Sequence, residues 1–375
     1  MPVILALVPR GAAALLVVTG LAAAGIVVLR PPPRLAALVH PGALLLALVL
    51  WGALSALWSI DAERSLVLAV RLLGVFAAGL ALAAAATRLD RPDRLLPLLL
   101  VGSAAGLAVM ALDLASHGRI NRLVHSRPYQ PTELNQLAVM VAILAMPAAA
   151  ALCKRSRPAA LAVFVIGIVT VALFVDVTAK FGLLVGIVAA VLVIWRRAAM
   201  VRAFAALSLV AVVVAPVTLP RLAPIPGIFW PVDHFKESAG HRLLIWWFTG
   251  DRIAEHPVVG WGLDASRSIP GGKDEFRPGE AHLPLHPHNA ALQAWLELGA
   301  PGAALMAVFL ALLWRRLADP DWPRLYVAAA AGSLAAAIGI AFAAYGIWQE
   351  WWLATLALSA FMVLALGREA TPPPP

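Results

Sequence analysis

The 375 residues are 62% hydrophobic and only 13% charged, whereas an average soluble domain carries roughly 25% charged residues. The apolar residues form long blocks without charge, and a helix needs about 20 such residues to cross a bilayer. The composition excludes fibrous, disordered and disulfide-stapled proteins and predicts an all-α, polytopic integral membrane protein. The formal net charge of +9 is then interpreted through membrane orientation and not through nucleic-acid binding.

Charged connectors divide the chain into about eleven predicted membrane spans, and a twelfth, short span at the N-terminus stays open. Residues 1–10 lack a basic stretch followed by a cleavage site, so the first helix is expected to be retained. We expect a single membrane domain over 1–375, with one large loop, 220–288, inside it. The approximate limits of the spans are 11–29, 37–58, 66–87, 95–112, 135–152, 159–176, 181–195, 203–219, 289–314, 325–344 and 351–366.

The basic residues predict the orientation. One alternate set of short connectors holds about half of the 29 lysines and arginines, so the positive-inside rule places these connectors and the C-terminus in the cytoplasm. The loop 113–134, on the opposite side, carries Arg119, Arg122 and Arg127 against that rule. A functional reason for these three arginines is therefore expected.

The loop 220–288 contains six of the nine histidines. An amphipathic helix is predicted over 240–255, ended by His256-Pro257 and able to lie in the membrane interface. Glycine and proline predict an irregular stretch over 270–279. One face of the predicted helix carries Leu243, Trp246, Trp247, Gly250 and Ile253. An interfacial aromatic belt is expected from Trp246, Trp247, Trp261, Trp348, Trp351 and Trp352.

The segment 286–302 holds the densest group of residues that could carry chemistry. Asn289 is a good N-cap for the helix that follows it, so His288 is predicted at a helix N-terminus beside the large loop. Such a terminus favours phosphate, and an imidazole there can accept a proton near neutral pH. Two alternatives are a purely structural His288 and a metal site formed by His282, His286 and His288.

His288-Asn289, then nine residues, Gly299, two residues and Gly302 resemble the signature of the O-antigen ligase and O-antigen polymerase superfamily. Gly240-His-Arg242 and the later Gly260-Trp-Gly262 resemble an outer-loop segment of the same family. Further motifs agree with it: Arg127 precedes Asn135-Gln-Leu-Ala, and Thr178-Ala179-Lys180 lies where the family usually has Ser-Arg.

The resemblance implies a GT-C-like glycosyltransferase that needs no metal, nucleotide or other cofactor. It would move a glycan from undecaprenyl pyrophosphate to a hydroxyl of lipid A–core, at the periplasmic face of the bacterial inner membrane. The implied partners are this donor, this acceptor and membrane lipids, without nucleic acid. Alternatives are a repeat-unit polymerase of O-antigen or exopolysaccharide, or a protein O-oligosaccharyltransferase. A solute transporter is disfavoured, because its ionisable residues would lie deep in the spans.

By the same resemblance, His288 is the general base of an inverting displacement. The pyrophosphate is bound by Arg242, Arg127 and Lys180, and Asn289, His286 and Glu297 support the site. Activity is expected to fall as the pH drops through the ordinary imidazole pKa of about 6.5.

The residues themselves leave four alternatives open. Arg242 could snorkel from the interface. Arg119 or Arg122 could replace Arg127. Lys180 could pair with Asp176. Glu297 could face solvent or orient Arg242.

Overall fold

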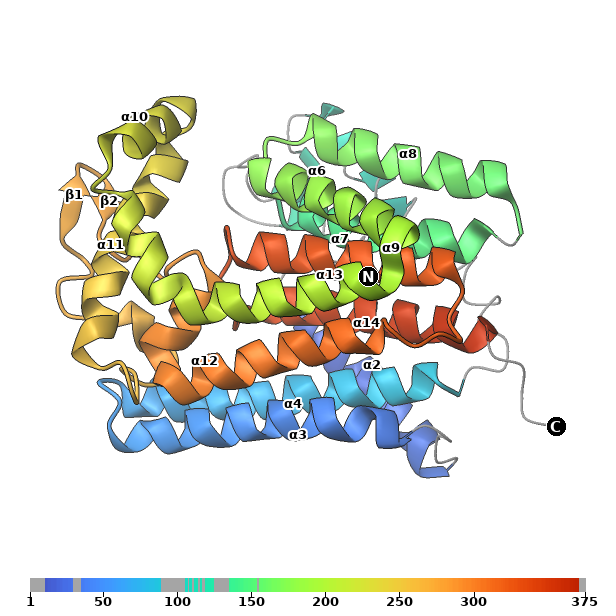
Figure 1. The fold of residues 1–375 in the computed structure, drawn as a ribbon, viewed down its shortest axis with the longest axis horizontal. Coiled ribbons are helices and arrows are strands. Elements are labelled where there is room, and N and C mark those ends of the chain that lie inside the picture. Colours follow the sequence, from blue (N-terminus) through green and yellow to red (C-terminus); the bar gives the residue numbers. More distant parts are fainter. Residues whose placement is uncertain are drawn as a thin grey trace.

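The computed structural model describes residues 11–29, 35–88, 135–153 and 155–370, together with parts of the segment 105–124. The described chain is almost entirely helical, with one small antiparallel hairpin. Figure 1 shows the long helices side by side in one bundle, with the elements of the large loop gathered at one end. The predicted all-α, polytopic class is confirmed.

Nine helices of the described residues form the bundle. Among the described residues, eight helices are long and apolar enough to cross a membrane, and α8 is shorter. The bundle helices are α2 (Gly11–Leu29), α3 (Leu35–Leu54), α4 (Ala62–Ala86), α7 (Asn135–Cys153), α8 (Arg157–Leu173), α9 (Val177–Thr218), α12 (Ala290–Arg316), α13 (Arg324–Ala341) and α14 (Glu350–Ala370).

Helix α9 contains two of the predicted spans. Its backbone leaves the helical region at Arg196 (φ −139°, ψ 68°), and the chain turns back there toward the end that carries the large loop (Figure 1). The predicted span 95–112 lies largely outside the described residues.

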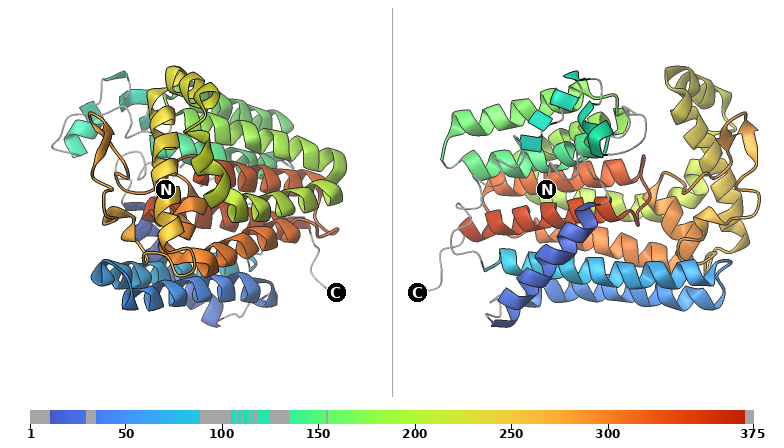
Figure 2. Two further views of the ribbon diagram at one scale, coloured as in Figure 1. Left: turned by 60° about the vertical axis from the view of Figure 1, so that its left-hand side comes forward. Right: turned by 180° about the vertical axis from the view of Figure 1, so that it is seen from behind.

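The large loop covers one end of the bundle (Figures 1 and 2). It contains η4 (Leu219–Leu222), α10 (Pro226–Phe235), α11 (Glu237–Glu255), η5 (Ala265–Arg267), β1 (Glu275–Arg277) and β2 (Glu280–Ala281). The predicted interfacial helix is therefore present as α11, starting three residues earlier. Two further short elements, η1 (Ser55–Leu57) and α6 (Arg119–Val124), lie outside this loop.

The prediction of an irregular stretch over 270–279 is wrong at its end. Glu275 pairs with Ala281 and Arg277 with Glu280 across an antiparallel hairpin. The Arg277 guanidinium also donates to both carboxylate oxygens of Asp233, at 2.9 and 3.0 Å. This ion pair joins the hairpin to α10, a contact between distant parts of the sequence that local turn residues do not reveal.

The expected aromatic belt is also wrong for three of its members. Trp348, Trp351 and Trp352 are 8%, 6% and 3% exposed, because their indoles pack inside the bundle end. Two of them also donate hydrogen bonds there, Trp348 to Glu297 and Trp351 to Gln349. The exposure of Trp247 does not contradict the belt, but it departs from the predicted apolar face of α11. Trp247 is 43% exposed and is absent from the buried face of α11, which is formed by Gly240, Leu243, Ile245, Thr249 and Ile253.

Candidate functional site

Helix α12 begins where the sequence predicted, with Asn289 as its cap. The Asn289 Oδ1 atom accepts the backbone N–H of Leu292 at 3.0 Å, and its Nδ2 donates to the carbonyl of Phe342 at 2.7 Å. The second bond ties the start of α12 to the residue that follows α13. The residue just before the cap is therefore held in a fixed place at the end of the bundle.

That preceding residue, His288, has an unusual backbone conformation. Its φ of +54° lies in the left-handed region, which non-glycine residues adopt rarely and often at functional sites. Its N–H donates to His286 Nδ1 at 3.2 Å, and the two imidazole rings lie 4.3 Å apart between centroids. His286 is buried, whereas His288 is partly exposed, so an incoming group can reach only the second ring.

Both histidines are held in the neutral form. Burial, with smaller contributions from the charges of Arg267 and Arg242, lowers the pKa of His286 to about 4. Burial also lowers the pKa of His288 well below its ordinary value, with contributions from His286, Arg242 and His241. A neutral imidazole has a free lone pair, so His288 can accept a proton throughout the physiological pH range.

Arg242 lies on α11 beside these rings and is partly buried. Within the described chain, no hydrogen bond or ion pair joins its guanidinium to another group. Burial lowers its pKa, and the nearby Asp176 and Tyr345 partly offset that shift. An arginine remains charged after such a shift, so Arg242 presents a cation and its N–H donors to a ligand.

Asp176 is the carboxylate next to Arg242, and its oxygens are already occupied. Its Oδ1 caps α9 by accepting the N–H groups of Thr178 and Ala179, at 2.8 and 3.3 Å. Its Oδ2 accepts the hydroxyl of Tyr345 at 2.8 Å. The alternative ion pair between Asp176 and Lys180 is therefore not present. Lys180, in the first turn of α9, is exposed.

Two hydrogen bonds hold α11 against the segment 281–288. Trp246 Nε1 donates to the carbonyl of Pro287 at 2.9 Å, and His241 Nε2 lies 2.8 Å from the carbonyl of Ala281. Arg242 sits between these two anchors along the helix. The structure thus brings together two predicted site residues, Arg242 and His288, that are 46 positions apart in sequence.

The predicted break in α12 is present at Gly299 (φ 62°, ψ −158°). Three carbonyls near it find donors from outside the helix: Leu296 accepts from Trp261 N, Glu297 from Gly262 N, and Leu298 from Trp51 Nε1, at 2.8–2.9 Å. Pro301 has no N–H, so the carbonyl of Glu297 would lack a partner even in a continuous helix.

Glycine is required on both sides of this contact. A Cβ on Gly299 would collide with the carbonyl of Val258, and one on Gly260 would lie 2.5 Å from the backbone of Glu297. Both residues also have a positive φ, which glycine adopts without strain. The two glycine-containing motifs noted in the sequence are therefore one structural unit, in which the turn 257–262 fits into the break in α12.

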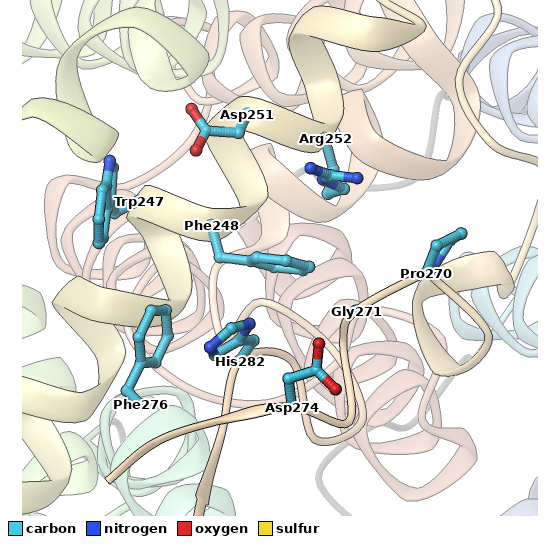
Figure 3. Close-up of a pocket in the computed structure, with 9 residues that line it drawn as sticks. All are labelled: Trp247, Phe248, Asp251, Arg252, Pro270, Gly271, Asp274, Phe276 and His282. Carbon is cyan, nitrogen blue, oxygen red and sulfur yellow. The ribbon is translucent and has the colours of Figure 1, made fainter.

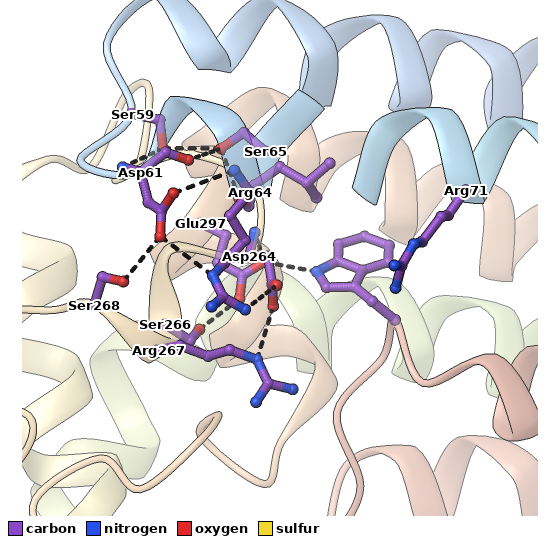
Figure 4. A network of polar contacts seen from close by, with 12 residues as sticks. Ser59, Asp61, Arg64, Ser65, Arg71, Asp264, Ser266, Arg267, Ser268 and Glu297 are labelled. Carbon is purple, nitrogen blue, oxygen red and sulfur yellow. Dashed lines mark hydrogen bonds and ion pairs between the residues drawn. The ribbon is translucent and has the colours of Figure 1, made fainter. Parts of the chain in front are cut away.

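Glu297 is fully buried at the centre of a hydrogen-bond network (Figure 4). Its carboxylate accepts from Ser266 Oγ, Gln293 Nε2, Trp348 Nε1 and the backbone N–H of Asp264, at 2.5–3.0 Å. Both predicted alternatives, that Glu297 faces solvent or orients Arg242, are wrong. Its partners come from three separate segments, so its role here is to hold the end of the bundle together.

An ion-pair network continues outward from this acid (Figure 4). Arg64, in the first turn of α4, pairs with Asp61 at 3.2 Å and with Asp264 at 3.3 Å, and Arg267 also pairs with Asp264. These contacts join the start of α4 to the segment just after the turn 257–262. The N-terminal helices are thereby connected to the end that carries the site.

The remaining predicted residues are placed as follows. Arg127 lies outside the described residues, and its competitors Arg119 and Arg122 lie in α6. The ring of His282 packs against Phe276, at 4.0 Å between centroids. No group of three His, Cys, Asp or Glu side chains in the described part of the chain is arranged to hold a metal ion.

Sequence reasoning missed two neighbours of Arg242. It considered Asp176 only as a partner of Lys180, and it did not consider Tyr345 at all. The available signal was weak: Tyr345 stands in the short polar segment between the last two predicted spans. Its contact with Asp176 joins positions 169 apart, which no local pattern predicts.

Fold and site together define a polytopic α-helical membrane protein with an arginine and a neutral histidine at one end of its bundle. Residues 142–307 match the family described as O-antigen ligase, a segment that contains Arg242, His288 and Gly299. The predicted resemblance is confirmed, and the chain is O-antigen ligase-like over this segment.

Curated relatives from rickettsiae agree with the family match. Proteins named "Putative polysaccharide ligase" from Rickettsia typhi and Rickettsia prowazekii are each 37% identical over 139 residues, which is 36% of this chain and 33% of the relative. A protein of the same name from Rickettsia bellii is 38% identical over 130 residues. The alignments thus span about a third of the length of these relatives.

Proposed function

We propose that the protein is a membrane glycosyltransferase of the O-antigen ligase type. It transfers a glycan from undecaprenyl pyrophosphate to a hydroxyl of lipid A–core, at the periplasmic face of the bacterial inner membrane. The observation that carries the proposal is the pairing of Arg242, a cation without a protein partner in the described chain, with the neutral His288. The family match supports the same reaction class.

The donor pyrophosphate interacts first with the cations. Arg242 binds a phosphate oxygen through its guanidinium, which suits phosphate geometry. The start of α12 adds N–H dipoles that favour an anion at the same place. Lys180, exposed near the start of α9, and Arg127 supply further positive charge from the same side of the membrane. A partly desolvated cation stabilises the leaving pyrophosphate more than a hydrated one would.

His288 then acts on the acceptor. Its imidazole takes the proton of the acceptor hydroxyl while that oxygen forms a bond to the anomeric carbon. The bond between this carbon and the pyrophosphate oxygen breaks, and the pyrophosphate leaves with the electron pair. Attack from the opposite side inverts the anomeric configuration. General-base help of this kind is worth roughly 10²–10⁴-fold in rate.

Donor binding strengthens the base. The charge of Arg242 contributes to the lowered pKa of His288, and a bound pyrophosphate offsets that charge. The pKa of His288 therefore rises when the donor is present, so the imidazole becomes a better proton acceptor when a transfer can occur. The acidic limb of the activity profile at saturating donor then reports His288 in the donor complex, and it lies at a higher pH than the pKa of His288 in the free protein.

A lipopolysaccharide gel tests the reaction class. The gene is deleted in its native host, and the strain is complemented with the wild type or with His288→Ala. Core-only lipopolysaccharide in the deletion and the mutant, with long lipid-linked polymer accumulating, supports the ligase. Single-repeat lipopolysaccharide would show a polymerase instead. An unchanged ladder in the deletion strain would overturn a role in lipopolysaccharide and direct the search to a protein acceptor, another polymer or a transported solute.

A further inference from the structure

A pocket lies on the face of α11 that points away from Arg242. Trp247, Phe248, Asp251 and Arg252 contribute to it from the helix. At about 100° per residue the first three point away from Arg242, whereas Arg252 lies at the side of the helix. The segment 270–282 forms the other wall, with Asp274, Phe276 and His282 (Figure 3). The cavity volume is about 460 Å³, and none of the steps proposed above uses it.

Aromatic rings form one side of this pocket. The indole of Trp247 stacks on the ring of Phe276, with centroids 6.1 Å apart and planes 23° apart. Phe276 also contacts the ring of His282 at 4.0 Å. Trp247 remains 43% exposed, so its apolar surface is accessible to a ligand from solvent.

Polar groups surround the rings, and two of them have a nitrogen atom without a partner, although the Arg252 guanidinium also pairs with Glu255 at 3.0 Å through Nη1. Asp251 and Asp274 are exposed and lie on opposite edges of the pocket (Figure 3). Arg252 Nε and His282 Nδ1 are buried nitrogen atoms without a hydrogen-bond partner among the described residues. A buried polar atom left unpaired is costly, so these two nitrogens point to a ligand or water that bonds to them.

Saccharides match this combination of groups. A sugar ring has an apolar face of C–H groups that can lie on an aromatic ring, and hydroxyls that bond to carboxylates and to nitrogens. Two aspartates against one arginine make the pocket a poor site for phosphate, in contrast to Arg242. The volume is in the range of small-molecule sites, about 300–1,000 Å³.

We propose that this pocket binds sugar residues of a glycan while the reacting end of the glycan lies at Arg242 and His288. The two places are separated by the width of one helix, about 10–12 Å with side chains, so a chain of several sugars passing around α11 reaches both. The role in transfer rests on the proposed function, whereas the binding itself does not. The glycan is either the donor polysaccharide or the oligosaccharide of the acceptor.

Binding of free saccharides to the purified full-length protein tests the pocket. The two probes are the polysaccharide and the core oligosaccharide, each released by mild acid from the lipid-linked and lipopolysaccharide fractions of the native host. Titration calorimetry measures affinity, and saturation-transfer NMR identifies the sugar protons in contact. The variants are Trp247→Ala and Asp251→Asn. The matched control is Trp230→Ala, because Trp230 is an exposed tryptophan (55%) on α10 of the same loop.

We expect at least one probe to bind, and Trp247→Ala to weaken that binding about 5–10-fold while Trp230→Ala leaves it unchanged. The probe that responds identifies the donor or the acceptor. If Trp247→Ala does not fold, the near-isosteric Asp251→Asn and Asp274→Asn carry the test. No binding of either probe, or equal affinity in wild type and pocket variants, would overturn the proposal.

His288→Ala separates this proposal from the reaction mechanism. It should bind the saccharide normally and fail to transfer it. If His288→Ala abolishes transfer but Trp247→Ala does not affect binding, the proposal of a saccharide pocket is contradicted and the reaction mechanism is not. If saccharide binding depends on Trp247 but His288→Ala retains full transfer, the mechanism is contradicted and the proposal of a saccharide pocket is supported.

Discussion

Two clusters of ionisable side chains lie at the same end of this bundle and differ in one respect. The Glu297 carboxylate accepts four hydrogen bonds from three segments, whereas the Arg242 guanidinium has no partner in the described chain. Burying a charge is costly unless it is paired, so the first cluster is complete in itself and the second is completed by a ligand. Burial alone therefore does not distinguish the two clusters, whereas hydrogen-bond completeness does.

The largest effect is expected at the incomplete cluster. Arg242→Ala should lower the rate of glycan transfer roughly 100-fold or more, because the leaving pyrophosphate loses a preorganised cation. The melting temperature in detergent should stay within a degree or two, since no hydrogen bond or ion pair with the described chain is lost. Arg242→Lys should restore part of the rate, because it keeps the charge but not the two-pronged geometry. A large drop in melting temperature would show that Arg242 is structural.

The complete cluster should respond in the opposite way. Glu297→Ala leaves four donors unpaired, three of them buried, and should reduce the free energy of unfolding by about 3 kcal/mol or more. Thermal unfolding of the purified variant measures this, with Glu63→Ala, an exposed acid on α4, as the control. Glu297→Ala protein that is as stable as the wild type but inactive would place this acid in the chemistry and undo the comparison.

The buried histidine beside the site predicts a pH dependence of stability. The pKa of His286 is lowered to about 4 in the folded state, whereas in the unfolded chain it is near 6.5. Between these values the unfolded state binds more protons, so stability is complete above pH 6.5 and falls as the pH drops toward 4. The slope is at most about 1.4 kcal/mol per pH unit for this group. Melting curves of the wild type should shift more between pH 7 and 5 than those of His286→Gln.

The smallest effect is expected at the exposed cation. Lys180→Ala should reduce transfer only a few-fold and chiefly raise the KM for the donor, since a solvated lysine contributes weakly to phosphate binding. Added salt should weaken donor binding in the wild type more than in this variant. If Lys180→Ala were as inactive as Arg242→Ala, the cation that matters most would have been assigned to the wrong helix.

The sequence predicts what depends on local patterns. Hydropathy locates the spans, Asn289 marks the start of α12, and Gly299 with Pro301 marks its break. It does not predict contacts between distant residues. Glu297 accepts hydrogen bonds from Asp264 and Trp348, which lie 33 and 51 positions away, and Trp348 is buried where it makes this bond. The motif residues Gly260 and Gly299 could be recognised separately, but only the structure shows that their backbones touch.

The most direct test of the account is transfer by purified protein in nanodiscs that contain lipid-linked donor and lipid A–core acceptor. His288→Gln removes the proton acceptor, and His234→Gln changes an exposed histidine of α10 as the matched control. The account predicts a loss of about 10²–10⁴-fold in the rate for His288→Gln, with full activity in the control and equal melting temperatures. Wild-type transfer by a folded His288→Gln protein would contradict it.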